Sequence, residues 1–378
     1  MKLTDICEFQ GGSQPPKSEW SSEYKDGYIR MLQIRDFTQE ERVTPEYVKI
    51  SNRLRFCAED DILIGRYGAS VGKILSGKSG AYNVAIMKTV PDTSVVRKQY
   101  MRYYFLSPNF QNYVLNLGGR AAQAGFSKDD LTRLEIAIVS LEEQDKIVNE
   151  LSTIEKTISI KQNQLKAFND LAKSRFIEMF GDPVENPKGW DKRSLLDMGT
   201  CKNGLNYRPG ETGVSVHCLG VGDFKDLSVI EDVSTLSTIE LAKLPSEECM
   251  LKDGDIVFVR SNGNKALVGR CLVVFPHTAK AVHSGFCIRY RRSCNDLDTT
   301  YLLSVLKSDS MRVKMAGHGA NIQNLNQKIL ASLDIPIPPL SLQNEFAEFV
   351  KLTDKSKFVC QFSPSIFYEI FLRFRHPP

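Results

Sequence analysis

Two pairs of cationic residues stand at matching places in this chain of 378 residues, each beside a loop rich in Gly, Ser and Asn. The first pair is Arg66 with Lys73, and the second is Arg260 with Arg270. Cationic side chains on such loops suit contact with phosphate groups, while Asn and Gln amides suit the edges of nucleic-acid bases. A shared structural role for the repeated arginine is the alternative reading.

A nucleotide site is not expected, although Gly72–Ser79 ("GKILSGKS") satisfies the G-x-x-x-x-G-K-[ST] phosphate-loop pattern. That chemistry needs a helix directly after the loop, so that its backbone N–H groups face the phosphates. Here "GAYNVAIMKTV" follows, which predicts a turn and then a strand. The matching stretch of the second copy, "VGRCLVVFPHT", lacks the pattern. A basic hairpin loop is the better interpretation.

Catalytic and metal-binding signatures are missing from the sequence. It contains no Asn/Asp-Pro-Pro-aromatic motif of an amino-methyltransferase, and "LGVGDF" at Leu219 is too short a Gly pattern for a methyl-donor cofactor. Glu23–Lys25 lacks the preceding Pro-Asp of a nuclease. The five histidines show no metal-ligand spacing. We therefore predict no catalytic residue, no metal and no cofactor in this chain.

The elements that position these residues form an internal repeat, which should be sought before any local motif. "LTDICEFQGG" at Leu3 resembles "LLDMGTCKNG" at Leu195, and "MLQIRDF" resembles "CLGVGDF" further along each copy. "DDILIGRYG" then resembles "DGDIVFVRSNG", which contain the two arginines. Finally "LEIAIVSLEEQDKIV" resembles "LDIPIPPLSLQNEFA", so that Gln144 matches Gln343. Four weak matches in one order indicate a duplicated unit.

Each copy predicts an α+β globule built from short strands, a helix and a closing strand. The first copy has strands at Ile62–Ile64, Val84–Met87 and Leu134–Val139 and a helix at Gln99–Leu106. The second has strands at Ile256–Val259, Phe286–Tyr290 and Leu333–Ile337 and a helix at Thr300–Leu306.

A long helix is predicted between the globules, from Glu142 to Phe180. Apolar residues recur there in alternating steps of four and three, a heptad seam typical of a helix that packs lengthwise on another. The residues expected to pair the two helices are Ile147, Leu151, Ile154, Ile158, Leu165 and Phe168 from the first helix and Phe346 and Val350 from the second. The predicted fold class is thus α+β, with two repeated globules joined and spaced by long helices that form an antiparallel coiled coil.

The overall composition fits a soluble globular protein, with 42% hydrophobic and 25% charged residues. No signal peptide and no membrane span is expected, so we predict a cytoplasmic protein. Nine cysteines without a C-x-x-C pair favour reduced thiols over disulfides. The net charge of +4 permits a nucleic-acid partner without requiring one.

With these motifs the chain resembles the specificity subunits of Type I restriction–modification systems. The resemblance covers residues 1 to about 357 and rests on three features: the two "DI…R…G…VG[KR]" units, the strand that leads into a helix containing Gln144 or Gln343, and "EMFGDPVENPKGW" at Glu178–Trp190. It implies that each globule is a target recognition domain for one half of a split DNA site, and that the helices act as a ruler between the halves.

The resemblance also implies which partners and candidate contacts to expect. The partners are double-stranded DNA with a bipartite site, two methylation subunits and restriction subunits; S-adenosylmethionine, ATP and Mg²⁺ are expected only on those subunits. The alternative is a two-domain protein-binding adaptor without sequence-specific DNA binding. The candidate DNA-binding residues are Arg66, Tyr67, Ser70, Lys73, Arg120, Gln123, Arg260, Asn262, Asn264, Lys265, Arg270, His318, Asn321 and Gln323.

The expected domain boundaries follow the repeat. Residues 1–138 and 182–335 form the recognition domains, residues 139–181 the first spacer helix, and residues 336–378 the second, altered after about residue 357. Thr353 and Lys357 replace apolar seam residues there, and Pro364 stands inside the expected helix. Because proline removes a helical hydrogen bond and clashes with the preceding turn, the second helix is expected to break between Lys357 and Pro364.

Overall fold

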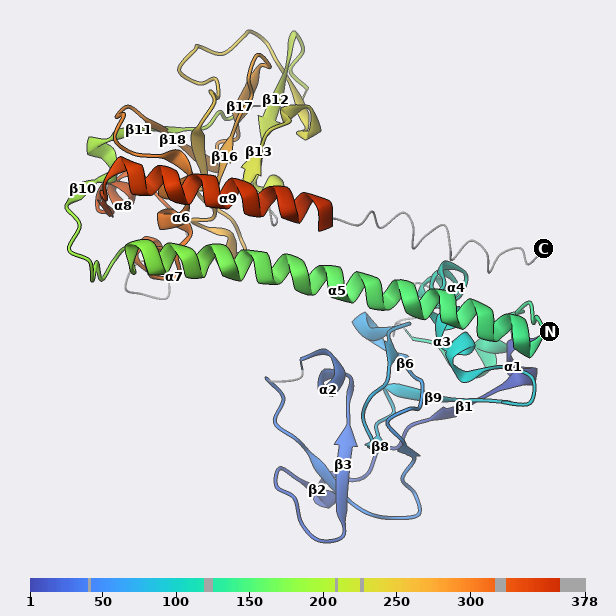
Figure 1. Cartoon of the computed structure of the whole chain (residues 1–378). Helices are drawn as coiled ribbons and strands as arrows, with labels where there is room; N and C mark the ends of the chain where they lie inside the picture. The colour runs from blue at the N-terminus through green and yellow to red at the C-terminus, as the bar shows by residue number, and fades with distance from the viewer. Residues whose placement is uncertain (40–41, 119–124, 208–209, 225–227, 317–323, 361–378) are drawn as a thin grey trace. The chain divides into compact units, whose positions relative to one another are not determined.

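The fold was analysed in a computed structural model, which describes residues 1–39, 42–118, 125–207, 210–224, 228–316 and 324–360 (Figure 1). The chain divides into two compact units, Met1–Lys161 and a second unit that begins at Gln162. The long helix α5 (Leu141–Phe180) begins in unit 1 and ends in unit 2. Among the described helices, none has an apolar stretch long enough to cross a membrane.

The two units are built on the same plan, which confirms the α+β class and the repeat. Each has a central sheet whose first four strands match in order and pair antiparallel, and in unit 2 a fifth strand is added in parallel at one edge. In unit 1 the sheet order is β1 (Cys7–Gly11), β9 (Ile86–Pro91), β6 (Leu63–Gly65) and β7 (Ile74–Leu75). In unit 2 it is β11 (Gly199–Asn203), β18 (Cys287–Arg292), β15 (Asp255–Val259), β16 (Cys271–Val274) and β13 (Val229–Ile230).

A second sheet accompanies the central one in each unit, and in both a parallel strand pair lies within it. In unit 1 the order is β2 (Trp20–Ser21), β4 (Tyr47–Lys49), β3 (Tyr28–Leu32), β8 (Gly80–Tyr82) and β5 (Phe56–Cys57). In unit 2 it is β14 (Thr238–Leu241), β12 (Val214–Leu219) and β17 (Ala281–His283). The parallel pairs are β3 with β8 and β12 with β17.

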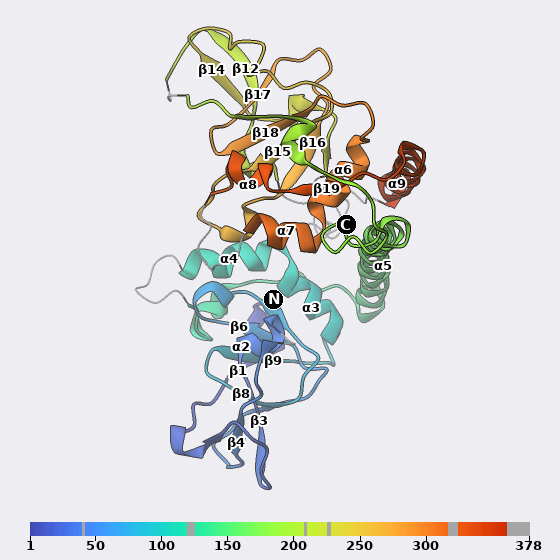
Figure 2. The ribbon, with the colours of Figure 1, turned by 90° about the vertical axis from the view of Figure 1, so that its left-hand side faces the viewer.

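Helices pack against each central sheet (Figure 2), and in unit 1 one of them, Ile34–Thr38, packs on the face opposite the others. Unit 1 has the short helices α1 (Leu3–Ile6) and α2 (Ile34–Thr38), and then α3 (Lys98–Leu106) and α4 (Pro108–Gly118). Unit 2 has α6 (Thr299–Lys307), α7 (Asp309–Ala316), α8 (Gln327–Ala331) and α9 (Leu340–Cys360). The core of unit 1 packs between sheet and helices, with the rings of Phe105 and Phe110 4.9 Å apart.

The repeated sequence motifs mostly serve this scaffold. Asp61 accepts a hydrogen bond from the Ala58 amide at 2.9 Å, and Asp255 accepts one from the Lys252 amide at 2.8 Å. Each aspartate therefore closes the turn before its strand. It also pairs with a cation on the neighbouring strand: Lys88 lies 2.6 Å from Asp61. The repeated Asp-Ile is thus explained by turn closure and a charge pair inside the globule.

Two glycine positions recur because the backbone leaves no room for a side chain. An added Cβ at Gly12 would lie 2.0 Å from the carbonyl oxygen of Asn83, and one at Gly204 would lie 2.1 Å from that of Ser284. Both clashes are with backbone and cannot be relieved by a side-chain rotation. This close approach accounts for the glycine that ends the first motif of each copy.

One predicted strand is wrong, and four begin one or two residues later than expected, two of them after a turn. Leu134–Val139 forms no strand, since only Glu135 makes a single bridge, to Lys2. The corresponding residues of unit 2 form β19 (Asp334–Pro336), which pairs with β10 (Lys192–Ser194). The two units differ in the pairing of this segment: in unit 2 three residues pair with β10, whereas in unit 1 Glu135 pairs with Lys2, the residue before α1. The strands predicted at Val84 and Phe286 begin at Ile86 and Cys287, after a turn.

The seam residues of α5 lie in partly or fully buried positions along one stripe. Leu151 is 1% exposed, and Ile147, Ile154, Ile158, Leu165 and Phe168 are half-buried, while most residues between them are exposed. Beyond this stripe, Phe176 and Phe180 are buried against Tyr301 of α6 and Phe346 of α9, with centroid distances of 4.8 to 5.9 Å. The heptad pattern did not include these two aromatics.

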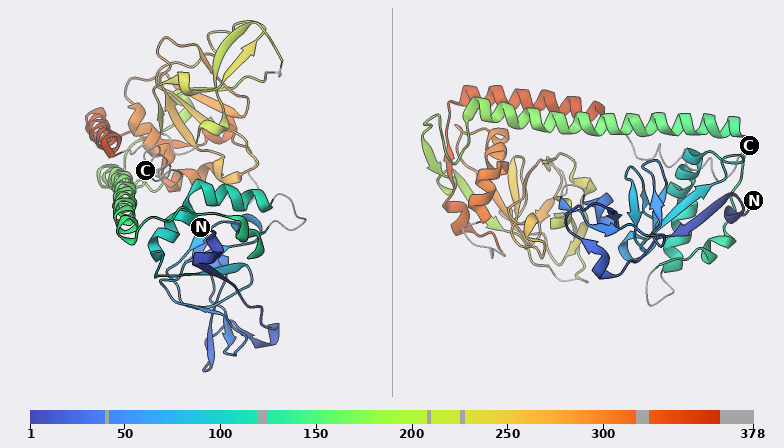
Figure 3. Two further views of the ribbon diagram at one scale, coloured as in Figure 1. Left: turned by 90° about the vertical axis from the view of Figure 1, so that its right-hand side faces the viewer. Right: turned by 90° about the horizontal axis from the view of Figure 1, so that it is seen from below.

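Within unit 2, α9 runs antiparallel beside the C-terminal part of α5 (Figures 1 and 3). Arg175 of α5 bonds to Glu345 of α9 at 2.9 Å, and Val350 packs on the same core as Phe346. Thr353 is 5% exposed, and its hydroxyl bonds to the Phe349 carbonyl at 2.9 Å. The break of the second helix was predicted between Lys357 and Pro364; α9 continues past Lys357 to Cys360, and residues 361–378 lie outside the described residues.

The end of α5 is capped by the junction that follows it. The Trp190 indole N–H donates to the Phe180 carbonyl at 3.1 Å, and the Lys188 ammonium group donates to the Glu178 carbonyl at 2.8 Å. The last carbonyls of a helix have no hydrogen-bond donors within the helix, and the side chains of Trp190 and Lys188 act as donors to two of them. The motif "GDPVENPKGW" therefore terminates the helix and turns the chain into unit 2.

Each unit is held to its spacer helix by one buried glutamine with the same three hydrogen bonds. In unit 1 the Gln144 carbonyl oxygen accepts from the Arg97 amide at 2.8 Å, and its NH₂ group donates to the carbonyls of Val95 and Val139 at 3.1 and 2.9 Å. Arg97 is the residue that caps α3. The glutamine therefore joins the first turn of α5 to the start of α3.

In unit 2, Gln343 makes the equivalent bonds. Its oxygen accepts from the amide of Asp298, the cap of α6, at 2.8 Å, and its NH₂ group donates to the carbonyls of Asp296 and Pro338 at 3.1 and 2.8 Å. Both glutamine side chains are 0% exposed.

We predict that Gln343→Met destabilises unit 2 by about 2–4 kcal/mol, because it removes all three hydrogen bonds of a fully buried amide and leaves one buried and two partly buried backbone groups without this partner. Urea unfolding is followed by the fluorescence of Trp190, with Trp20, the only other tryptophan, replaced by Phe. Asn344→Ala, at the exposed neighbouring position, is the control and should change the free energy of unfolding by less than about 0.5 kcal/mol. Equal midpoints for the two variants would contradict the role of Gln343.

A second buried polar residue of unit 2 is a histidine, whereas unit 1 has a tyrosine at the matching position. His283 is 1% exposed, and its Nε2 lies 3.1 Å from the Lys202 carbonyl oxygen. Tyr82 occupies the matching place in unit 1, and its hydroxyl donates to the Gln10 carbonyl at 3.3 Å. Burial lowers the pKa of His283 to about 4, because desolvation disfavours the imidazolium.

The replacement His283→Tyr, which copies unit 1, should remove the pH dependence of stability that follows from this pKa. An unfolded histidine has a pKa near ~6.5, so between about pH 6.5 and pH 4 the unfolded state binds a proton that the folded state does not. Stability from neutral His283 is complete above that window and is lost as the pH falls through it, by on the order of 3 kcal/mol. The free energy of unfolding of unit 2, measured at pH 7.5 and 4.5, should fall less in the variant. An identical fall in both proteins would refute the assignment.

Candidate nucleic-acid interface

The repeated arginine lies at the start of a hairpin loop whose shape is fixed by backbone bonds. The Arg66 amide donates to the Ala85 carbonyl at 3.0 Å, and the Arg260 amide donates to the Phe286 carbonyl at 2.8 Å. At the far end of the loop, Gly72 and Gly269 have φ values of +79° and +78°. Only glycine adopts this left-handed conformation without strain, which explains the repeated Val-Gly.

The same arginine joins the hairpin loop to the Gly-rich polar loop that follows α4 or α7. The carbonyl of Arg66 accepts from the Phe126 amide at 3.2 Å, and the carbonyl of Arg260 accepts from the Leu325 amide at 2.7 Å. Phe126 and Leu325 are buried, so each polar loop is anchored where it re-enters the globule. The described bonds therefore tie each hairpin loop to the residue near the end of the polar segment, Phe126 or Leu325, while most of that segment lies outside the described residues.

The arginine side chains are half-buried at the base of these loops. The Arg66 guanidinium lies 4.7 Å from the centroid of the Tyr67 ring, and Tyr67 is 40% exposed. One guanidinium N–H of Arg260 donates to the Gly285 carbonyl at 3.3 Å. A single long bond leaves most of the five donors of an arginine available for an anionic partner. The backbone of the arginine thus serves the fold, and its guanidinium suits ligand contact.

The second cation differs between the copies. Lys73 is exposed, whereas Arg270 is half-buried and donates to the Phe224 carbonyl at 3.4 Å. Ser70 is half-buried in the short turn of the first loop. Lys73 and Arg270 therefore match in sequence but differ in exposure and in hydrogen bonding.

The hairpin loop that follows Arg260 in unit 2 contains hydrogen bonds between its own asparagine side chains and backbone amides. The carboxamide oxygen of Asn262 accepts from the Asn264 amide at 2.7 Å, and that of Asn264 accepts from the Ala266 amide at 3.1 Å. The other predicted contact residues, or their side chains, lie outside the described part of the chain: Arg120, Gln123, Lys265, His318, Asn321 and Gln323.

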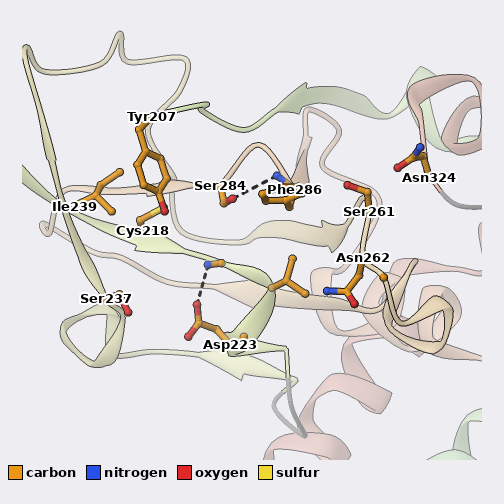
Figure 4. A pocket seen from close by; sticks show the side chains of 14 residues that line it. Tyr207, Cys218, Asp223, Ser237, Ile239, Ser261, Asn262, Ser284, Phe286 and Asn324 are labelled. Atoms are coloured by element: carbon orange, nitrogen blue, oxygen red, sulfur yellow. Dashed lines mark hydrogen bonds between the residues drawn. The ribbon is translucent and has the colours of Figure 1, made fainter. Parts of the chain in front are cut away.

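A hollow of about 800 Å³ opens beside this loop in unit 2 (Figure 4). Its wall includes Ser261, Asn262 and Asn324 from the two contact loops, together with Tyr207 and Phe286. Sequence reasoning missed Tyr207 and Phe286; the exposed fraction of Phe286, 63%, depends on a turn that its apolar pattern did not predict. Hydroxyl, amide and aromatic groups here can bond and stack against a planar polar ligand.

No group of three or more His, Cys, Asp or Glu side chains within the described residues is placed to hold a metal ion. The residues of the phosphate-loop pattern are followed by strand β8 and not by a helix. The segment is also not the hairpin loop that was predicted, because its strand β7 pairs with β6 while β8 belongs to the second sheet.

A family model described as "Type I restriction modification DNA specificity domain" matches residues 1–168 and again residues 187–358. The chain belongs to this family. The "Type I restriction enzyme MjaVIII specificity subunit" of Methanocaldococcus jannaschii is 22% identical over 94% of this chain and 85% of its own length. The MjaIX specificity subunit of the same organism is 27% identical over 54% of this chain and 52% of its own.

The fold is also that of a solved specificity subunit. The crystal structure of the Type I restriction–modification S subunit from M. genitalium covers 100% of this chain, with a TM-score of 0.58 and 15% sequence identity. At that identity the likeness concerns the fold alone, and it agrees with the duplicated α+β globule.

We predict that Lys73→Ala and Arg270→Ala act on different properties. Lys73→Ala should weaken DNA binding for all sequences and reduce the slope of log affinity against log salt by about 1, with no change in stability. Arg270→Ala should lower the free energy of unfolding of unit 2 by about 1 kcal/mol, because its bond to Phe224 is lost. DNA binding is measured over a salt series, and unfolding by Trp190 fluorescence. A salt slope unchanged by Lys73→Ala would exclude the phosphate contact.

Proposed function

We propose that this chain is the DNA-recognition subunit of a Type I restriction–modification complex, and that each globule reads one half of a bipartite DNA site. The observation that supports this most is the duplicated loop pair. In both units the same backbone bonds, from Arg66 or Arg260, tie a hairpin loop to the buried residue, Phe126 or Leu325, that follows a Gly-rich polar segment of the sequence. Family membership supports DNA as the ligand of these loops.

The two units share a scaffold but differ in their hairpin loops. Such a difference is needed if the units are to recognise different bases. The loop of unit 2 is three residues longer between its arginine and glycine and contains Asn262 and Asn264. Arg66 and Arg260 are proposed to contact phosphate or guanine, and the Asn and Gln side chains to contact base edges. Binding residues are commonly carried on loops positioned by a rigid scaffold.

The helices are proposed to fix the spacer and to dock two methylation subunits. At 1.5 Å per residue, α5 is on the order of 60 Å long, or about 18 base-pair steps. Domain boundaries at about residues 138, 181 and 335 remain part of this proposal. A rigid element between two readers sets the distance between half-sites, as the dimer geometry does in two-chain readers.

Catalysis is proposed to reside on the partner subunits. The methylation subunits would use S-adenosylmethionine, and the restriction subunits ATP and Mg²⁺, while this chain binds and orients DNA. The adaptor alternative predicts no counterion release on contact with DNA. A steep fall of DNA affinity with rising salt concentration therefore favours DNA recognition over the adaptor alternative.

The test of this function is a domain exchange. Residues 1–138 are replaced by those of a related specificity subunit with a known site, the protein is produced with its methylation subunit, and methylated bases are mapped across the genome. We expect one half of the motif to change, while the other half and the number of unread bases between them persist.

The reciprocal exchange of residues 182–335 is the matched control and should change the other half alone. A motif in which both halves change together, or a continuous motif in the parent protein, would contradict two independent readers.

A further inference from the structure

Each globule exposes an aromatic side chain next to its repeated arginine, but the two aromatics come from different segments. In unit 1 it is Tyr67, directly after Arg66, with 40% of its surface exposed. In unit 2 the residue after the arginine is Ser261, and the exposed aromatic is Phe286, in the turn between β17 and β18, with 63% exposed.

The fold does not require an aromatic at position 286. Ala85 takes the equivalent place in unit 1: its carbonyl accepts from Arg66, and its amide donates to the Asn83 side chain at 3.1 Å. The Phe286 amide likewise donates to the Ser284 hydroxyl at 3.3 Å. Since alanine serves in the same backbone arrangement, the ring of Phe286 contributes little to the core. A ring left mostly in water gains little of the free energy that burial would supply.

The surroundings of Phe286 point to a ligand. The ring is part of the wall of the 800 Å³ hollow, where Ser261, Asn262 and Asn324 present hydroxyl and amide groups (Figure 4). The Arg260 guanidinium is tied to the carbonyl of Gly285, the residue directly before Phe286. Amide and hydroxyl groups and an apolar ring from three segments of the chain therefore line the hollow, and the Arg260 guanidinium is bonded to the residue before Phe286.

We propose that Phe286 is a base-reading residue of unit 2, whose ring contacts the C5-methyl group of a thymine in the half-site that this unit reads. This inference rests on the proposed function. In the major groove thymine is distinguished by that methyl group, which apolar side chains contact, while amides pair with adenine and arginine with guanine. An intercalating wedge needs a ring that enters between base pairs; Phe286 instead stands beside hydrogen-bonding groups suited to base edges.

The test uses the chain assembled with its methylation subunits and duplexes that carry its mapped site. Thymines of the second half-site are replaced one at a time by deoxyuridine, which lacks only the methyl group. At one position we expect wild-type affinity to fall about fourfold, the effect of one methyl group removed from an apolar contact. Phe286→Ala should bind the two duplexes equally, and its methylome should tolerate other bases at that position.

Val313→Ala is the matched control, because Val313 belongs to the same unit and is also 63% exposed. It should preserve the discrimination between thymine and deoxyuridine. The proposal is overturned if no deoxyuridine changes the affinity, if the second half-site holds no thymine, or if Phe286→Ala weakens all duplexes alike. Absence of a split motif in the wild-type methylome would instead overturn the proposed function.

Discussion

A buried glutamine amide fixes how each globule is attached to its helix. Gln144 and Gln343 each bond to the backbone cap of the first long helix of the globule and to two carbonyls, and neither side chain is exposed. An amide in a dry site that loses one partner leaves a polar group unpaired, so such a joint has one favoured geometry. The proposed ruler between two readers needs a fixed joint at each reader, and the repeat contains such a joint twice.

What recurs in the sequence is mainly scaffold, and what differs is the surface offered to a ligand. Asp61 and Asp255 close turns, and Gly12 and Gly204 allow close backbone approach. Around them the exposed groups change: Tyr67 is replaced by Ser261, and Ala85 by Phe286. One scaffold with two different exposed surfaces is what the proposed bipartite, asymmetric site requires.

Sequence reasoning could predict the features that depend on periodicity and on repetition. The heptad steps predicted α5 to within one residue at its start, and the duplicated motifs predicted the two α+β globules. It missed Phe176 and Phe180, because their burial comes from α6 and α9, far away in sequence. It also read Phe286 as an apolar strand residue, because the preceding turn that exposes the ring depends on the bond from its amide to Ser284. The strand predicted at Leu134–Val139 was also wrong, because an apolar pattern does not show how many residues of another strand are available to pair with it.

The most direct test of the account is a chemical footprint of the assembled complex on its mapped DNA site, for wild type, Arg66→Ala and Arg260→Ala side by side. The account predicts two protected segments separated by unprotected bases in the wild type. Each variant should lose protection of one segment, a different one in each case, while the other segment stays protected. Loss of both segments in either variant, or a single continuous footprint in the wild type, would contradict two independent readers held on one chain.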